Sequence, residues 1–113
     1  MISPKLIGKL TVFVVTATHA ADQCPLSNAK VRKMFPSTEA RMEAGKKFGA
    51  KVLVGPLFSI NHKTIVVAEA SSVDSVMDML MELRIPQWNA VDIQPYMSAD
   101  DAVNMFDKVQ TIY

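Results

Sequence analysis

The hydrophobic pattern of the chain contains four short runs that are typical of strands. Residues 10–17 are rich in β-branched residues and apolar on both alternating faces. Residues 51–58 and 63–69 form two further runs on either side of a turn at 59–62, and residues 88–97 form the last. A strand that is apolar on both faces is typical of the middle of a sheet, so the first run is predicted to be a central strand.

Helical patterns lie between these strands. Ser37 or Thr38 can cap a helix that ends at Gly49. A capping-box spacing from Ser71 opens a second helix, which ends before Pro86. The predicted element order is therefore β-α-β-β-α-β.

Two further segments stand outside this alternation. Residues 22–36 form a long loop with a short helix predicted over 27–34. Ser98 begins another capping-box spacing, followed by a terminal helix whose apolar stripe reaches Val109. Long ordered loops often carry function, so the loop marks a region of interest.

The element order predicts the architecture. With right-handed crossovers, β-α-β-β-α-β forms an antiparallel sheet in strand order 4-1-3-2, with both core helices on one face. This is a ferredoxin-like α+β fold with an added C-terminal helix. At 113 residues, the chain is expected to form a single domain over 1–113.

The other face of such a sheet needs a cover. Because the first strand is apolar on both sides, we expect this second face to be buried too. A second copy packing sheet to sheet gives a dimeric α+β barrel with a ligand-sized cavity between sheet and helices. The terminal helix folding across the face is the alternative. We favour the homodimer because the terminal stripe is short.

Composition narrows the partners and the compartment. The net charge is +1 and the basic residues are dispersed, which argues against nucleic acid. No stretch is long enough for a transmembrane helix. A single cysteine fits a reducing, cytoplasmic setting. The alternative is secretion, because Lys5 and Lys9 precede an apolar run as in a signal peptide.

Chemically versatile residues fall at one predicted edge of the sheet. His19 follows the first strand, His62 opens the third and Trp88 opens the fourth. Strands three and four both flank strand one, so these residues are expected to lie about 5–10 Å apart. The long loop starts at the same edge and brings Cys24 within reach.

A cofactor-independent enzyme acting on a small organic ligand is one interpretation of this edge. His19 and His62 are the candidate catalytic residues, because a histidine can shuttle a proton. Trp88 would form an aromatic wall, and the sheet would add polar contacts. The candidate ligand-binding residues are Trp88, Thr16, Asp92 and Gln94.

Two alternatives use the same residues differently. His19, His62 and Cys24 offer two imidazoles and a thiolate, which suits zinc or copper. A non-catalytic module would bind a small molecule or a protein without transforming it. In that case the histidines are ordinary strand-end residues and Trp88 is core or interface. The sequence names no cofactor and no substrate.

The element order, the size and the apolar first strand resemble the dimeric α+β barrel superfamily. Thr18-His19 followed by the segment 22–25, Asp-Gln-Cys-Pro, is similar to a pattern in small members of this group. That group includes proteins like the antibiotic-biosynthesis monooxygenases, the muconolactone isomerases and YciI. The resemblance covers residues 8–97 and implies the fold and the dimer. It implies no reaction, because this superfamily hosts many chemistries.

Overall fold

The computed structural model describes residues 10–106 and 108. The predictions made for Lys5, Lys9 and Val109 lie outside these residues. The strands and helices are β1 (Thr11–Thr18), α1 (Ala29–Met34), α2 (Thr38–Phe48), β2 (Ala50–Phe58), β3 (Lys63–Ala70), α3 (Val73–Glu82), β4 (Ala90–Tyr96) and α4 (Ala99–Phe106). Two short 3₁₀ turns are η1 (Ala21–Gln23) and η2 (Ile85–Gln87).

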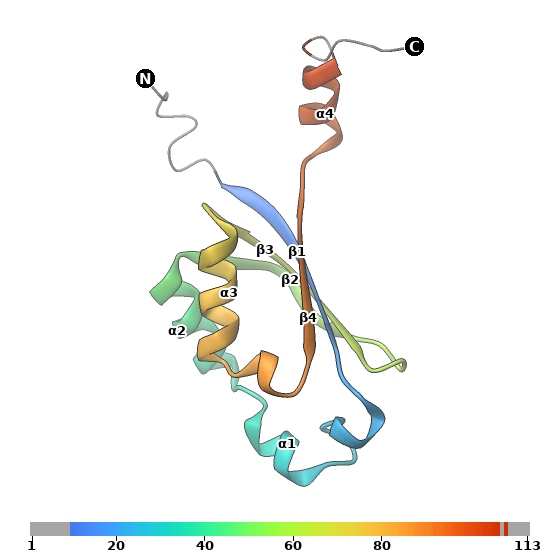
Figure 1. The fold of residues 1–113 in the computed structure, drawn as a ribbon. Coiled ribbons are helices and arrows are strands. Elements are labelled where there is room, and N and C mark those ends of the chain that lie inside the picture. Colours follow the sequence, from blue (N-terminus) through green and yellow to red (C-terminus); the bar gives the residue numbers. More distant parts are fainter. Residues whose placement is uncertain (1–9, 107, 109–113) are drawn as a thin grey trace.

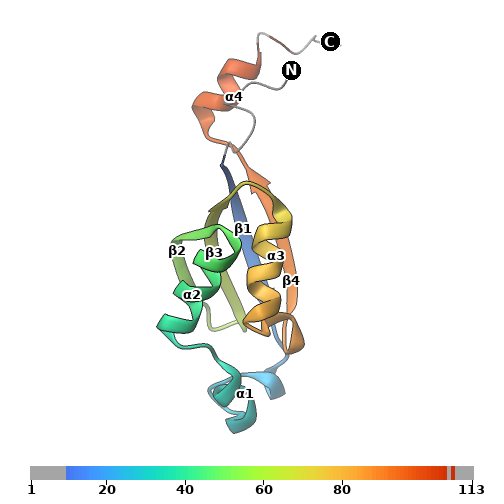
Figure 2. The ribbon, with the colours of Figure 1, turned by 90° about the vertical axis from the view of Figure 1, so that its left-hand side faces the viewer.

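The predicted α+β fold and strand order are confirmed. The four strands form one antiparallel sheet in the order β2-β3-β1-β4, with β1 between β3 and β4. Helices α2 and α3 lie side by side on one face of the sheet (Figures 1 and 2). The arrangement is compatible with a ferredoxin-like fold. Helix α1 and turn η1 lie beyond one end of the sheet, below the helix layer in Figure 1.

The core forms where the helices meet the sheet. Phe13, Val15 and Ala17 alternate along β1 and are buried on the helix side, while their neighbours are half-buried. This alternation reflects the period of two in a strand. The eight buried residues of the core cluster are Phe13, Val15, Ala44, Ala50, Ala70, Val76, Met79 and Leu80.

Local side-chain chemistry explains the helix ends. The Ser37 hydroxyl accepts a hydrogen bond from the Ala40 N–H (3.1 Å), which caps α2. Gly49 ends α2 in the left-handed region with φ 71°. Helix α3 is capped by Ser72 instead of the expected Ser71, and its hydroxyl accepts from the Ser75 N–H (3.2 Å). The N-cap therefore lies one residue later than the sequence spacing indicates.

The fourth strand is shorter than predicted. Ile85–Gln87 forms turn η2, and the Trp88 N–H donates to the Ile85 carbonyl oxygen (3.3 Å). Pro86 fixes this turn, because its ring presets the backbone φ. Strand β4 therefore begins at Ala90, and Trp88 precedes the strand.

The second strand is irregular. β2 is an edge strand, and its pairing with β3 shifts register between Val52 and Val54 and again between Val54 and Leu57. Gly55 lies inside this irregular stretch with φ 96°, and an added Cβ would stand 2.6 Å from the Ile65 carbonyl oxygen. A glycine is therefore required at this bulge.

No described helix or loop covers the sheet face opposite α2 and α3, which is called the open face below. Helix α4 extends away from the end of β4 in both views (Figures 1 and 2), so it does not lie across this face. The radius of gyration, 16.8 Å, exceeds the roughly 13 Å of a compact domain of this size, which agrees with a projecting arm. Ile65 and Tyr96 remain 42% and 56% exposed. None of the described helices could cross a membrane.

Candidate functional site

Two histidines meet where β1 ends beside the β2–β3 turn. The His19 backbone N–H donates to the His62 carbonyl oxygen (3.1 Å), which ties the strand end to the turn. The two imidazole centroids are 5.2 Å apart with an angle of 69° between the rings. The predicted proximity of these histidines is confirmed, and its cause is the antiparallel pairing of β1 with β3.

Trp88 reaches the same place from the turn before β4. Its ring centroid is 5.4 Å from that of His19 and 6.3 Å from that of Phe35. Trp88 is only 7% exposed, and its Nε1 has no hydrogen-bond partner among the described residues. The indole therefore forms an aromatic wall behind His19, although it does not belong to a strand.

Asn89 fixes the orientation of His19. The Asn89 amide nitrogen donates to the Ile85 carbonyl oxygen (3.1 Å), so its Oδ1 is left to accept from His19 Nδ1 (3.3 Å). The proton of the neutral imidazole then lies on Nδ1, and Nε2 carries a lone pair. Nε2 is buried and has no partner among the described residues. Asn89 was not singled out from the sequence, because its role depends on this contact.

Cys24 lies in a loop that holds its own shape. The Asn28 side-chain amide donates to the Asp22 carbonyl oxygen (2.9 Å), and the Ser27 hydroxyl donates to that of Ala21 (3.2 Å). Arg32 closes the loop from α1 by donating to the Pro25 carbonyl oxygen (2.8 Å). Cys24 itself is 8% exposed and lies well before the start of α1.

His19, Cys24 and His62 together form one cluster. One ligand atom from each of His19, Cys24 and His62 lies within 4.8 Å of the others. The cluster combines a strand end, a loop and a turn. The topology therefore brings together all the residues for which the sequence predicted metal binding, although their roles stay predictions.

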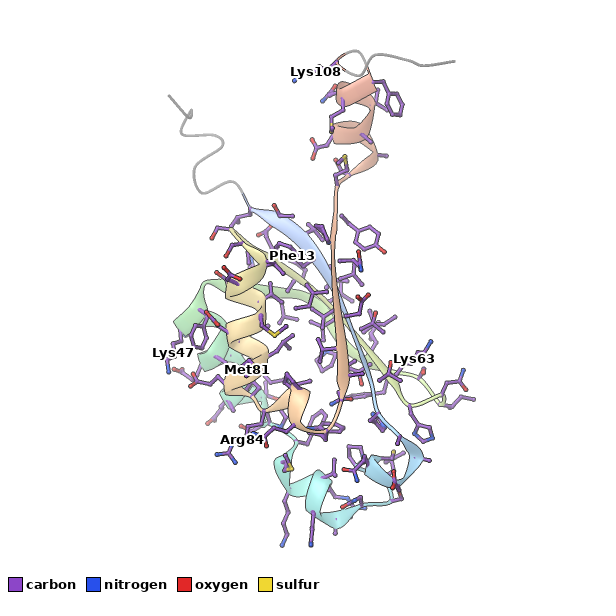
Figure 3. All side chains as sticks on the ribbon, viewed as in Figure 1. Phe13, Lys47, Lys63, Met81, Arg84 and Lys108 are labelled. Carbon is purple, nitrogen blue, oxygen red and sulfur yellow. The ribbon has the colours of Figure 1, made fainter. Side chains whose placement is uncertain are left out.

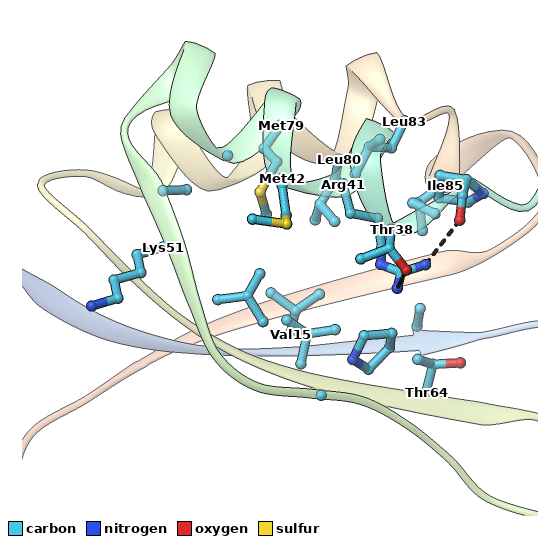
Figure 4. Close-up of a pocket in the computed structure, with 18 of the residues that line it drawn as sticks. Val15, Thr38, Arg41, Met42, Lys51, Thr64, Met79, Leu80, Leu83 and Ile85 are labelled. Carbon is cyan, nitrogen blue, oxygen red and sulfur yellow. Dashed lines mark hydrogen bonds between the residues drawn. The ribbon is translucent and has the colours of Figure 1, made fainter.

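A separate pocket of about 710 Å³ lies between the helices and the sheet. Figure 4 shows α2 and α3 above the pocket and the strands below it. Val15 and Val66 line the sheet side, and Met42, Met79 and Leu80 line the helix side. Its volume is in the range that holds small organic ligands.

Trp88 and Asn89 connect the pocket to the histidine cluster. Both line the pocket, whereas His19, Cys24 and His62 do not. His19 contacts Trp88 and Asn89 from the other side. The cluster and the pocket are therefore neighbours that share a wall.

Arg41 is a half-buried cation that lines the pocket from α2. The Arg41 guanidinium donates to the Pro36 carbonyl oxygen (2.8 Å) and to the Thr38 hydroxyl (3.1 Å). Both partners are neutral, and Arg41 forms no ion pair among residues 10–106 and 108. Figure 4 shows its side chain reaching from the helix into the space above the sheet, while Lys51 lies toward the other end. Arg41 was missed from the sequence because its helical spacing alone does not distinguish it from a solvated residue.

Three of the predicted ligand-binding residues lie elsewhere. Thr16 alternates with the buried Val15 and Ala17 and therefore points to the open face of the sheet. Asp92 pairs with Thr16 in the register, and its carboxylate accepts from the Gln94 amide (3.1 Å). Thr16, Asp92 and Gln94 are not among the residues that line the pocket. Trp88 alone of the predicted set lines it.

The charged residue of β4 is Asp92, which lies on the open face of the sheet together with Thr16. Asp92 is exposed on an edge strand, which accounts for a carboxylate in the middle of a strand.

Comparison of the chain with protein-family models, curated proteins and solved structures found no match. What the chain does is therefore inferred from its residues and their placement.

Proposed function

We propose that this chain binds a small apolar molecule with an anionic group, in the pocket between the helices and the sheet. The observation that carries the proposal is the pocket of about 710 Å³ with Arg41 in its wall. Most of the wall is aliphatic, aromatic or thioether in character. An apolar pocket with a few convergent polar groups is the usual form of a small-molecule site.

The charge of the wall favours an anion. Arg41, Lys46 and Lys51 line the pocket, against the single carboxylate of Glu69. Arg41 is half-buried, while the two lysines are exposed. No carboxylate among the described residues pairs with Arg41, and the planar donors of a guanidinium match a carboxylate. The proposed ligand therefore has an apolar body and a carboxylate-like head that pairs with Arg41.

The proposal is for binding, without turnover. A proton shuttle requires a histidine within reach of the substrate. His19 and His62 do not line the pocket, and Trp88 and Asn89 stand between them and its contents. Conversion of the ligand by either histidine is therefore not part of the proposed function.

A homodimer completes the proposal. The open face carries several apolar side chains beside the polar Thr16, Asp92 and Gln94, and a second copy packing sheet to sheet would cover them. Such an assembly would be a dimeric α+β barrel, the superfamily that the sequence resembles. The apolar residues that the register places on this face are Val12, Val14, Leu57, Ile65, Val67 and Tyr96.

Decanoate is a suitable probe of the pocket, because it joins an apolar chain to a carboxylate. Trp88 is the only tryptophan of the sequence and lines the pocket, so its fluorescence reports occupancy directly. We expect a saturable change at one decanoate per chain. In Arg41→Gln, the affinity for decanoate is expected to fall about 10–100-fold, the usual value of a hydrogen bond to a charged group.

The controls separate charge from hydrophobic binding. Lys33→Gln removes an exposed cation of α1 that does not line the pocket, and its affinity for decanoate should equal that of the unmodified chain. Decanol should bind the unmodified chain and Arg41→Gln equally well. Failure of decanoate to saturate the Trp88 signal, or equal loss in both lysine and arginine variants, would contradict the proposal.

A further inference from the structure

We infer that His19, Cys24 and His62 form a binding site for a late first-row transition metal, Zn²⁺ or copper. This site goes beyond the proposed function, because none of its three residues lines the pocket. The donors come from three segments that only the fold brings together. One ligand atom of each residue already lies within 4.8 Å of the other two.

The spacing is close to what one ion requires. Ligand atoms at 2.0–2.3 Å from a tetrahedral ion lie about 3.5 Å from each other. The cluster therefore closes on an ion by side-chain movements of about 1 Å. The hydrogen bond from the His19 N–H to the His62 carbonyl oxygen already holds two of the three segments together.

Hydrogen bonds orient the His19 ring so that one of its nitrogens is free to bind a metal ion. Its Nδ1–H is held by Asn89 Oδ1, and the Asn89 amide is itself held by the Ile85 carbonyl. A metal-binding histidine commonly donates its other ring N–H to such an outer partner, which sets the tautomer and the ring orientation. The remaining lone pair, on Nε2, is buried without a partner among the described residues. A buried acceptor of this kind is costly unless something binds it.

Cys24 supplies a thiol that is shielded from solvent. Its loop is fixed by side-chain hydrogen bonds from Asn28 and Arg32, so the position of Cys24 is built before any ion binds. A rigid first coordination shell needs less ordering when the ion binds. Because the thiolate is the form that binds metal, binding releases the thiol proton to water.

His62 occupies a strained backbone conformation. Its φ is 62°, in the left-handed region that is uncommon for residues other than glycine, although asparagine, aspartate and histidine are found there more often than most. Residues in sparsely populated backbone conformations are often found at functional sites. Glycine would adopt this φ without strain, so the backbone of the turn does not itself call for a histidine.

The donor set selects the class of ion. Two imidazoles and a thiolate favour zinc and copper, whereas Mg²⁺ and Ca²⁺ prefer oxygen ligands. The cluster contains no carboxylate. Three protein ligands leave one position of a tetrahedral ion open for water or another ligand, and three-coordinate copper needs no fourth.

The test is titration of the metal-free full chain with Zn²⁺, with Cu⁺ under anaerobic conditions and with Mg²⁺. We expect one Zn²⁺ or one Cu⁺ per chain and no binding of Mg²⁺. Titration with Co²⁺ should produce thiolate-to-cobalt charge-transfer absorption in the near ultraviolet, which identifies Cys24 as a ligand. Bound metal should also protect Cys24 from alkylation.

Substitutions assign the ligands. Cys24→Ser and His62→Gly should each weaken binding at least about 100-fold, more than the loss of an outer-sphere partner. His62→Gly should fold normally, because glycine adopts φ 62° freely. Arg84→Gly is the matched control: Arg84 also has a positive φ, 61°, and lies outside the cluster, so its metal affinity should be unchanged.

The inference is overturned if neither Zn²⁺ nor Cu⁺ binds stoichiometrically, or if folded Cys24→Ser and His62→Gly bind as well as the unmodified chain. Decanoate binding to the pocket is measured separately, in metal-free protein. The metal site and the proposed function can therefore fail independently.

Discussion

Single residues do most to define the candidate site, and Asn89 shows this well. It contacts no proposed metal ion, yet it determines which nitrogen of His19 carries the proton. It also lines the pocket on its other side. One amide side chain therefore orients His19 and also forms part of the pocket wall.

Asn89 can be tested as a positioning residue. Asn89→Leu removes the acceptor for His19 Nδ1–H, and we expect the affinity for Zn²⁺ to fall about 10–100-fold, as for other outer partners of metal ligands. Asn89→Asp keeps an acceptor for His19 Nδ1–H but loses the donor to the Ile85 carbonyl oxygen, so its affinity for Zn²⁺ should lie between those of Asn89→Leu and the unmodified chain. Calorimetric titration of both folded variants measures this difference. Equal affinity of Asn89→Leu and the unmodified chain would show that Asn89 does not act through His19.

Gly45 has a purely structural role at the same scale. It is buried where α2 meets β2, and a Cβ added there would stand 2.6 Å from the Ala50 carbonyl oxygen. Overpacking of this kind costs about 1–3 kcal/mol. That exceeds the gain of about 1 kcal/mol in helix propensity from glycine to alanine.

We therefore expect Gly45→Ala to lower the free energy of unfolding, measured as a lower urea midpoint with an unchanged slope. Glu43→Ala on the same helix is the control. Glu43 is exposed, so its effect should stay within about 0.5 kcal/mol. An unchanged midpoint for Gly45→Ala would mean that α2 can move away from β2 at little cost.

At the scale of elements, the segment from η1 to α1 matters because it presents Cys24. Side-chain to backbone hydrogen bonds hold it, and it lies beyond the end of the sheet (Figure 1). Arg32 bridges from α1 to two carbonyl oxygens of this segment, those of Pro25 and Leu26. The loop is therefore ordered by its own contacts as well as by the core.

Removing this bridge should loosen the loop without unfolding the domain. We expect Arg32→Ala to raise the alkylation rate of Cys24 in metal-free protein several-fold, because local opening exposes the thiol. Lys33→Ala is the matched control, since Lys33 is an exposed neighbour outside these contacts. Mass spectrometry after timed iodoacetamide treatment provides the rates. Equal rates would show that Arg32 does not hold the loop closed.

At the scale of the whole molecule, the open sheet face and the projecting α4 are the two incomplete features. Helix α4 buries none of its residues, and Phe106 at its end is 67% exposed. The apolar face of the sheet lies on the side away from α2 and α3 (Figure 2). Figure 3 shows side chains projecting from the strands on the side away from α2 and α3 as well as toward these helices.

The proposed homodimer makes the open face testable. Ile65→Lys places a charge on this face, and burial of an unpaired charge in an interface is costly. We expect sedimentation to show a dimer for the unmodified chain and a shift to monomer for Ile65→Lys. Ile60→Lys is the control, because Ile60 is 96% exposed in the β2–β3 turn. A monomeric unmodified chain would contradict the dimer.

The sequence by itself determined the elements and their order. Alternating and helical patterns, capping serines and Gly49 act over a few residues, so the printed sequence contains their cause. The strand order followed from the handedness of crossovers, which applies to any chain with this element order. The same reasoning predicted that His19, His62 and Trp88 would meet, and the structure confirms that they do.

Only the tertiary structure decided which side chains face which space. A change of one position moves a strand residue to the other face, so Thr16, Asp92 and Gln94 lie opposite the pocket. The roles of Arg41 and Asn89 depend on contacts between distant elements, which no local pattern records. The precise approach of Cys24 to the histidines depends on the loop's own hydrogen bonds. The tertiary structure therefore decided the geometry of the candidate site, because packing fixes distances between residues that their spacing in the sequence does not determine.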